Sequence, residues 1–63
     1  MWSLEANIIM AFMLRELNTT RYGYRSFIEG CYQSGIKRHG LAVPEEPMSD
    51  IVDRVLEILN GEE

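Results

Sequence analysis

The sequence has few of the residues that usually stabilise a small domain through disulfide bonds or a bound metal ion. Cys31 is the only cysteine and His39 the only histidine, so one chain can form neither a disulfide bond nor a Cys/His zinc site. A domain of about 60 residues buries only about 60% of the surface that its unfolded chain exposes, which leaves its stability marginal. We therefore expect one domain, residues 1–63, that gains stability by associating with copies of itself.

Long apolar runs and a basic leader are also missing. The longest apolar run is seven residues, 8–14, against the roughly 20 that are needed to span a bilayer. Residues 1–5 lack the basic region of a signal peptide, and a lone cysteine suits a reducing compartment. These features predict a soluble, cytoplasmic protein without membrane attachment.

Side chains for catalysis or metal binding are scarce. Cys31 and His39 form the one candidate pair of nucleophile and base, but in a continuous helix they would lie about 12 Å apart. We expect Cys31 to be a small buried hydrophobe and His39 to be a charge at a helix C-terminus. Residues 30–37 lack a P-loop, because Ile36 separates the second glycine from the lysine. The sequence therefore predicts no enzyme, no cofactor and no metal ion.

What the sequence does contain is helical patterning. It predicts an all-α fold of two to three short helices, at about residues 3–17, 21–39 and 48–60. A β-strand is the alternative for the short apolar run, but its Met, Leu and Ala residues favour a helix. Ser3 is placed to cap the first helix and Ser49 or Asp50 the third. The second helix starts either near Thr20 or at a capping box over residues 26–29.

The apolar patterns predict how these helices pack. Seven consecutive apolar residues cover the whole circumference of the first helix, so we expect it to be buried on two sides, once within a hairpin-like protomer and once in a homodimer or higher oligomer. The third helix has a single apolar arc of about 160° and should pack on one side. Small residues at 26, 30 and 34 should let another helix approach closely. The predicted oligomer interface consists of Ile8, Ile9, Phe12, Met13 and Leu14.

Charge is divided unevenly along the chain. Residues 15–39 hold five Lys or Arg against two Asp or Glu, whereas residues 40–63 hold one against seven. Such mixed charge usually marks two solvated faces that attract one another within or between chains. We expect a protein partner to bind at one of two charged regions, which comprise Arg21, Tyr22 and Arg25, or Asp50, Asp53 and Glu57.

One stretch resembles a known group of proteins. Residues 15–30, RELNTTRYGYRSFIEG, resemble short accessory proteins from the early regions of lambdoid phages, over about a quarter of the chain. The resemblance implies a non-enzymatic protein made early in infection. Such a protein would adjust host physiology or the choice between lytic and lysogenic growth by binding a host protein. The resemblance transfers no site residues.

Two functions follow from these patterns. The first is a non-enzymatic, homo-oligomeric interaction protein. The alternative is a small helical DNA-binding regulator that uses the basic residues 15–39, with Arg21, Arg25, Lys37 and Arg38 as phosphate contacts. Phosphate contacts weaken steeply as salt rises, so the salt dependence of any DNA binding separates the two.

Overall fold

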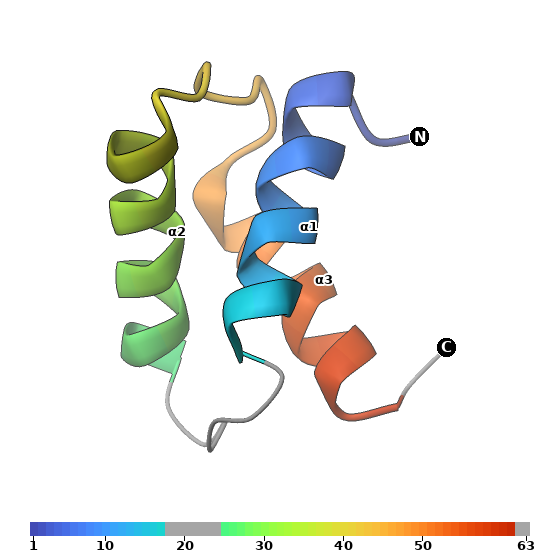
Figure 1. Ribbon diagram of the computed structural model, residues 1–63. Helices are drawn as coiled ribbons and strands as arrows, with labels where there is room; N and C mark the ends of the chain where they lie inside the picture. Colours follow the sequence, from blue (N-terminus) through green and yellow to red (C-terminus); the bar gives the residue numbers. More distant parts are fainter. Residues whose placement is uncertain (18–24, 62–63) are drawn as a thin grey trace.

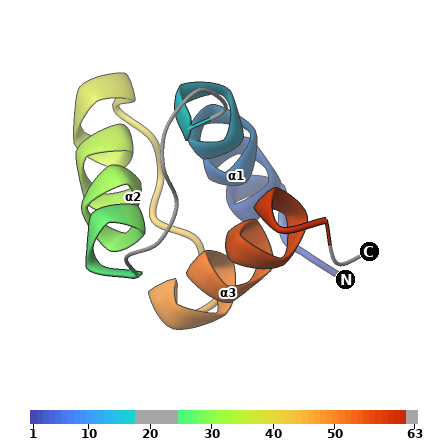
Figure 2. The ribbon, with the colours of Figure 1, turned by 90° about the horizontal axis from the view of Figure 1, so that it is seen from below.

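A computed structural model describes residues 1–17 and 25–61, and this part of the chain is built from three α-helices. α1 spans Leu4–Leu17, α2 spans Arg25–His39 and α3 spans Met48–Leu59. α1 and α2 run in opposite directions, and α3 packs against both of them (Figures 1 and 2). The all-α prediction is confirmed. The predicted helical residues 21–24 and the alternative start near Thr20 lie outside the described residues.

The helix ends follow from local chemistry. The Ser3 hydroxyl accepts a hydrogen bond from the Ala6 amide at 3.1 Å, which is the predicted cap of α1. Gly40 ends α2 with a φ of 62°, a conformation that glycine adopts without strain, and the Leu41 amide then donates to the Ile36 carbonyl at 3.0 Å. The predicted cap of α3 is wrong: Ser49 and Asp50 lie inside the helix, and Pro47 precedes its first residue.

One side of each helix contributes to a single core. On α1 the buried residues recur at the spacing of one helical stripe, and on α3 they occupy the predicted apolar arc. The prediction that α3 packs on one side is thereby confirmed, because three of its apolar residues are fully buried. The core residues are Ala6, Ile9, Met10, Met13, Leu17, Ile28, Tyr32, Ile51, Val52 and Val55.

Within one chain, α1 is buried along one side. Ile9 and Met13, two residues of the predicted oligomer interface, are 0% and 1% exposed inside the protomer core. In this fold they are not accessible to a second chain, so we correct that part of the interface. The reason is periodicity: Ile9 and Met13 lie one turn apart on the side that faces α2 and α3, whereas Ile8 lies on the opposite side.

The close approach between helices occurs at a different glycine from the one predicted. A Cβ atom placed on the buried Gly35 would lie 3.2 Å from Ile9 Cδ1, so the absence of a side chain lets α2 pack tightly on α1. By contrast, Ser26, Gly30 and Ser34 are exposed, and nothing lies within 4 Å of a Cβ added at Gly30. The small residues at 26, 30 and 34 therefore do not mediate helix packing within the chain.

The segment between α2 and α3 is tied to the start of α1. Glu46 accepts hydrogen bonds from the Ser3 amide at 2.7 Å and from the Ser3 hydroxyl at 2.8 Å. The bond from the Ser3 amide is the main reason that the pKa of Glu46 is lowered. This pairing closes the bundle at the end where α1 begins. None of the helices in the described ranges has the length and apolar character required to cross a membrane.

The two helical glycines of α2 offer a matched test of this packing. Leucine improves helix propensity at both positions by about 0.8 kcal/mol, but only at Gly35 does the new side chain meet the core. We expect Gly35→Leu to lower the free energy of unfolding by about 1–3 kcal/mol through overpacking. Gly30→Leu should leave it unchanged or raise it. Urea denaturation of both variants measures the difference, and equal effects would contradict the packing.

Candidate functional site

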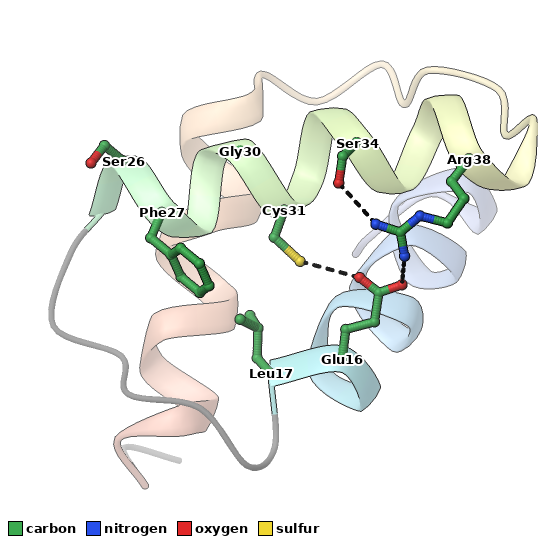
Figure 3. A pocket seen from close by; sticks show the side chains of 8 residues that line it. All are labelled: Glu16, Leu17, Ser26, Phe27, Gly30, Cys31, Ser34 and Arg38. Atoms are coloured by element: carbon green, nitrogen blue, oxygen red, sulfur yellow. Dashed lines mark hydrogen bonds and ion pairs between the residues drawn. The ribbon is translucent and has the colours of Figure 1, made fainter.

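A groove of about 470 Å³ lies between the C-terminal half of α1 and the outer side of α2 (Figure 3). Leu17 and the half-exposed Phe27 form its apolar end, and charged side chains form the other end. Ser26, Gly30 and Ser34 leave the α2 side open, because none of them carries a large side chain. The residues that line the groove are Glu16, Leu17, Ser26, Phe27, Gly30, Cys31, Ser34 and Arg38.

The carboxylate of Glu16 joins the polar side chains of the groove. Its Oε2 atom accepts a hydrogen bond from Arg38 Nη1 at 2.8 Å and lies 3.4 Å from His39 Nε2. Its Oε1 atom accepts a hydrogen bond from the Cys31 thiol at 3.5 Å. Arg38 also donates to the Ser34 hydroxyl at 3.3 Å within α2 (Figure 3). The contacts of Glu16 with Arg38 and Cys31 link α1 to α2.

The pKa values of two groups in this network are shifted. Partial burial alone would raise the pKa of Glu16, but the hydrogen bond with His39, the charge of Arg38 and the Cys31 thiol together lower it below the ordinary value. Burial is the main cause that raises the pKa of Cys31, and the neighbouring Glu16 carboxylate adds to it. The thiol is therefore stabilised in its protonated form, which is the weakly nucleophilic one.

The structure refines both predictions for Cys31 and His39. Cys31 lines the groove and is partly buried against the core, so its predicted burial is only partial. His39 is the last residue of α2, as predicted, and its ring stacks on Phe12 with ring centroids 4.1 Å apart. Although the two residues lie on one helix, both contact Glu16, through different carboxylate oxygens. Within the described residues, no group of three His, Cys, Asp or Glu side chains is placed to hold a metal ion.

The predicted acidic surface is largely engaged in ion pairs. Asp53 accepts a short hydrogen bond from Arg25, which also pairs with Glu29 at 3.3 Å. Glu57 pairs with Arg54 at 3.3 Å. Asp50, Asp53 and Glu57 lie together with Arg54 and Trp2 around a shallow hollow of about 240 Å³, so the structure does gather the three carboxylates. The other predicted partner-binding residues, Arg21 and Tyr22, lie outside the described part of the chain.

A second surface is apolar and lies on the outer side of α1. Leu4 is 70% exposed and Ile8 is 38% exposed, and Ala11 is also exposed. Phe12 is half-buried at the border with α2, while Leu14 packs against the core from the other border. We call Leu4, Ile8, Ala11 and Phe12 the outer face of α1.

Sequence reasoning missed Glu16, which was counted only as a charge within a basic segment. A signal was available in the spacing, because Glu16 follows Phe12 by one turn and both lie on the flank of α1 that faces α2. The spacing does not predict the basic partners, because a short connection favours an antiparallel pair, which brings the end of α1 toward the start of α2 and not toward its basic last turn.

Comparison of the chain with protein-family models, curated proteins and solved structures found no match.

The Glu16 network predicts a pH-dependent contribution to stability. Because folding lowers the pKa of Glu16, its contribution is present above the unfolded-state pKa and is lost as pH falls through the folded-state pKa. We expect Glu16→Gln to reduce the free energy of unfolding by about 0.5–1 kcal/mol at neutral pH. The difference from the natural chain should shrink as the pH falls through the folded-state pKa of Glu16.

Urea denaturation at several pH values measures this difference. Glu45→Gln serves as the control, because Glu45 is an exposed carboxylate that forms no ion pair with the described residues. A stability difference for Glu16→Gln that is the same at pH 7 and pH 3 would show that the network does not act through the carboxylate charge.

Proposed function

We propose that this chain is a non-enzymatic, α-helical interaction protein that associates with itself through the outer face of α1 and acts by binding another protein. The observation that carries the proposal is the exposure of Leu4 and Ile8 on a helix whose opposite side already supplies half of the core. Figures 1 and 2 show α2 and α3 on one side of α1, and no other helix of the described residues lies on the side away from them.

Energetic reasons favour an assembled state. The core of a chain this short contributes little net stability, and the chain has no second cysteine for a disulfide bond. Covering the apolar outer face in a complex removes it from water, and each Å² of apolar area covered contributes about 25 cal/mol before the cost of association. Self-association therefore supplies stabilisation that the isolated chain lacks.

The partner of the assembled protein is proposed from the sequence resemblance. Residues 15–30 resemble early accessory proteins of lambdoid phages, which implies a host protein as partner and an effect on host physiology or on the choice between lytic and lysogenic growth. The hollow around Asp50 on α3 is a charged surface on the exterior of the bundle, where such a partner can bind.

The ion pairs favour this function over DNA binding. Arg25 pairs with Asp53 and Glu29, and Arg38 pairs with Glu16. Two of the four cations expected to contact phosphates are therefore already neutralised by carboxylates within the chain. A phosphate would have to compete with these carboxylates, which weakens the electrostatic attraction on which DNA binding depends.

Replacement of one outer-face residue tests self-association. The natural chain should give a mass of at least two chains by light scattering at protein concentrations of about 10 µM to 1 mM. Ile8→Glu should raise the dissociation constant at least about tenfold, because the carboxylate would have to lose water in an apolar contact. Val43→Glu is the matched control: Val43 is an equally apolar and more exposed residue outside the outer face.

The proposal fails if the natural chain is a folded monomer throughout that concentration range, or if Val43→Glu dissociates it as strongly as Ile8→Glu. Helicity measured by circular dichroism shows that both variants fold. Tight duplex DNA binding that weakens steeply with salt and is lost in Arg25→Ala would instead assign the chain to the regulators.

A further inference from the structure

The outer face of α1 contains a hollow with the geometry of a coiled-coil contact. The hollow measures about 210 Å³ and is lined by Ile8, Ala11, Phe12 and Arg15. These four residues have the spacing i, i+3, i+4 and i+7, so they are neighbours on one side of a single helix. In coiled coils, four such residues form the hole into which one side chain of the facing helix inserts. The hollow therefore has the form of a receptor for a side chain on another helix.

The two ends of the same helix carry opposite charges beside this hollow. Glu5 lies in the first turn of α1 and Arg15 in the last turn, and both are exposed. Neither forms an ion pair with any residue in the described ranges 1–17 and 25–61. A partner helix would form ion pairs with both residues if it placed a basic side chain opposite Glu5 and an acidic side chain opposite Arg15.

We propose that this partner is α1 of a second copy of the same chain, packed antiparallel about a two-fold axis. The inference rests on the self-association proposed above and adds its arrangement: Ile8 of each copy inserts into the hollow of the other, and Glu5 of each copy pairs with Arg15 of the other.

The spacing along the helix makes the two contacts compatible. The centre of the hollow lies between Ala11 and Phe12, about 5 Å along the axis from Ile8 at 1.5 Å per residue. When Ile8 of one antiparallel helix lies opposite that centre, Glu5 lies opposite residues 14–15 of the other helix. The two-fold axis repeats both contacts, which gives two inserted side chains and two ion pairs. One register therefore satisfies the apolar and the charged groups together.

A parallel two-fold pair of α1 helices would form neither the insertion of Ile8 nor the Glu5–Arg15 ion pairs. In that arrangement identical residues face one another, so Glu5 would lie opposite Glu5 and Arg15 opposite Arg15. Ile8 would meet Ile8 instead of the hollow centred 3–4 residues away. The charges at the two ends of α1 thus select the antiparallel pair.

Charge reversal tests the arrangement. At low salt, Glu5→Arg and Arg15→Glu should each weaken self-association about tenfold, because each change turns two attractive pairs into two repulsive ones. An equimolar mixture of the two variants should associate like the natural chain, since every cross-chain pair is then attractive. The double variant Glu5→Arg/Arg15→Glu should also associate about as strongly as the natural chain. Analytical ultracentrifugation measures the dissociation constant of the two single variants, their mixture and the double variant. High salt should reduce the differences between these dissociation constants and that of the natural chain.

Two controls separate pairing from other effects. Glu45→Arg changes the net charge as Glu5→Arg does, but away from α1, and it should leave the dissociation constant within about twofold of the natural value. Both reversals also oppose the dipole of α1, but the double variant carries both changes, so its recovery excludes helix destabilisation as the cause. Should the single reversals unfold, Glu5→Gln and Arg15→Gln should each weaken association by about twofold to fivefold.

The outcomes separate this inference from the proposed function. If the natural chain associates and Ile8→Glu blocks association, but neither the mixture nor the double variant recovers, the outer face pairs in another arrangement and the antiparallel inference is wrong. The same holds if the single reversals associate like the natural chain. If the natural chain stays monomeric, self-association itself is refuted.

Discussion

The burial of one side of α1 against both other helices is the constraint on which the rest of the structure depends. Five of the ten core residues come from this helix, and they occupy a stripe of about 100°. α2 approaches the stripe closely because Gly35 presents no side chain to Ile9. α3 covers the remainder with Ile51, Val52 and Val55. No other element of the described chain offers an alternative core, so the orientation of α1 fixes the positions of α2 and α3.

Polar contacts of two carboxylates tie α1 to the elements around it. At one end Glu46 binds both the amide and the hydroxyl of Ser3, and so holds the segment after α2 against the start of α1. Further along α1, Glu16 binds Arg38, His39 and Cys31 on α2. Both carboxylates have a lowered pKa, which means that the folded chain stabilises their charged forms. The apolar stripe supplies the packing, and these two carboxylates fix which parts of the helices lie together.

Much of the fold could be read from periodicity. The apolar arc of α3 predicted its position within about one residue. Periodicity gave less information about α1, because seven consecutive apolar residues do not reveal which of them face the core. That choice depends on tertiary contacts, so the apolar run alone places Ile9 and Met13 at an interface although they belong to the core.

The candidate site was harder to predict than the fold. Glu16, Cys31 and Arg38 are far apart in sequence, and only the packing of α1 on α2 brings their side chains together. Charge counting predicted faces of opposite sign that attract one another within or between chains, and Arg25 does pair with Asp53 across α2 and α3, but the count did not predict this particular pair. A count of charges along the chain contains no information about which charges meet, because side-chain pairing depends on the register of the helices.

The residues of the apolar run lie on three parts of the circumference of α1. Ile9, Met10 and Met13 face the core, and Phe12 lies on the flank where its ring stacks on His39. Ile8 and Ala11 remain on the outer face and line the hollow with Phe12. A helix needs only one apolar stripe to fold onto one core, and a second apolar side in water costs free energy that the short chain cannot readily offset. The outer face is therefore the feature of this sequence that folding of the single chain does not explain, and the proposed contact with another helix would account for it.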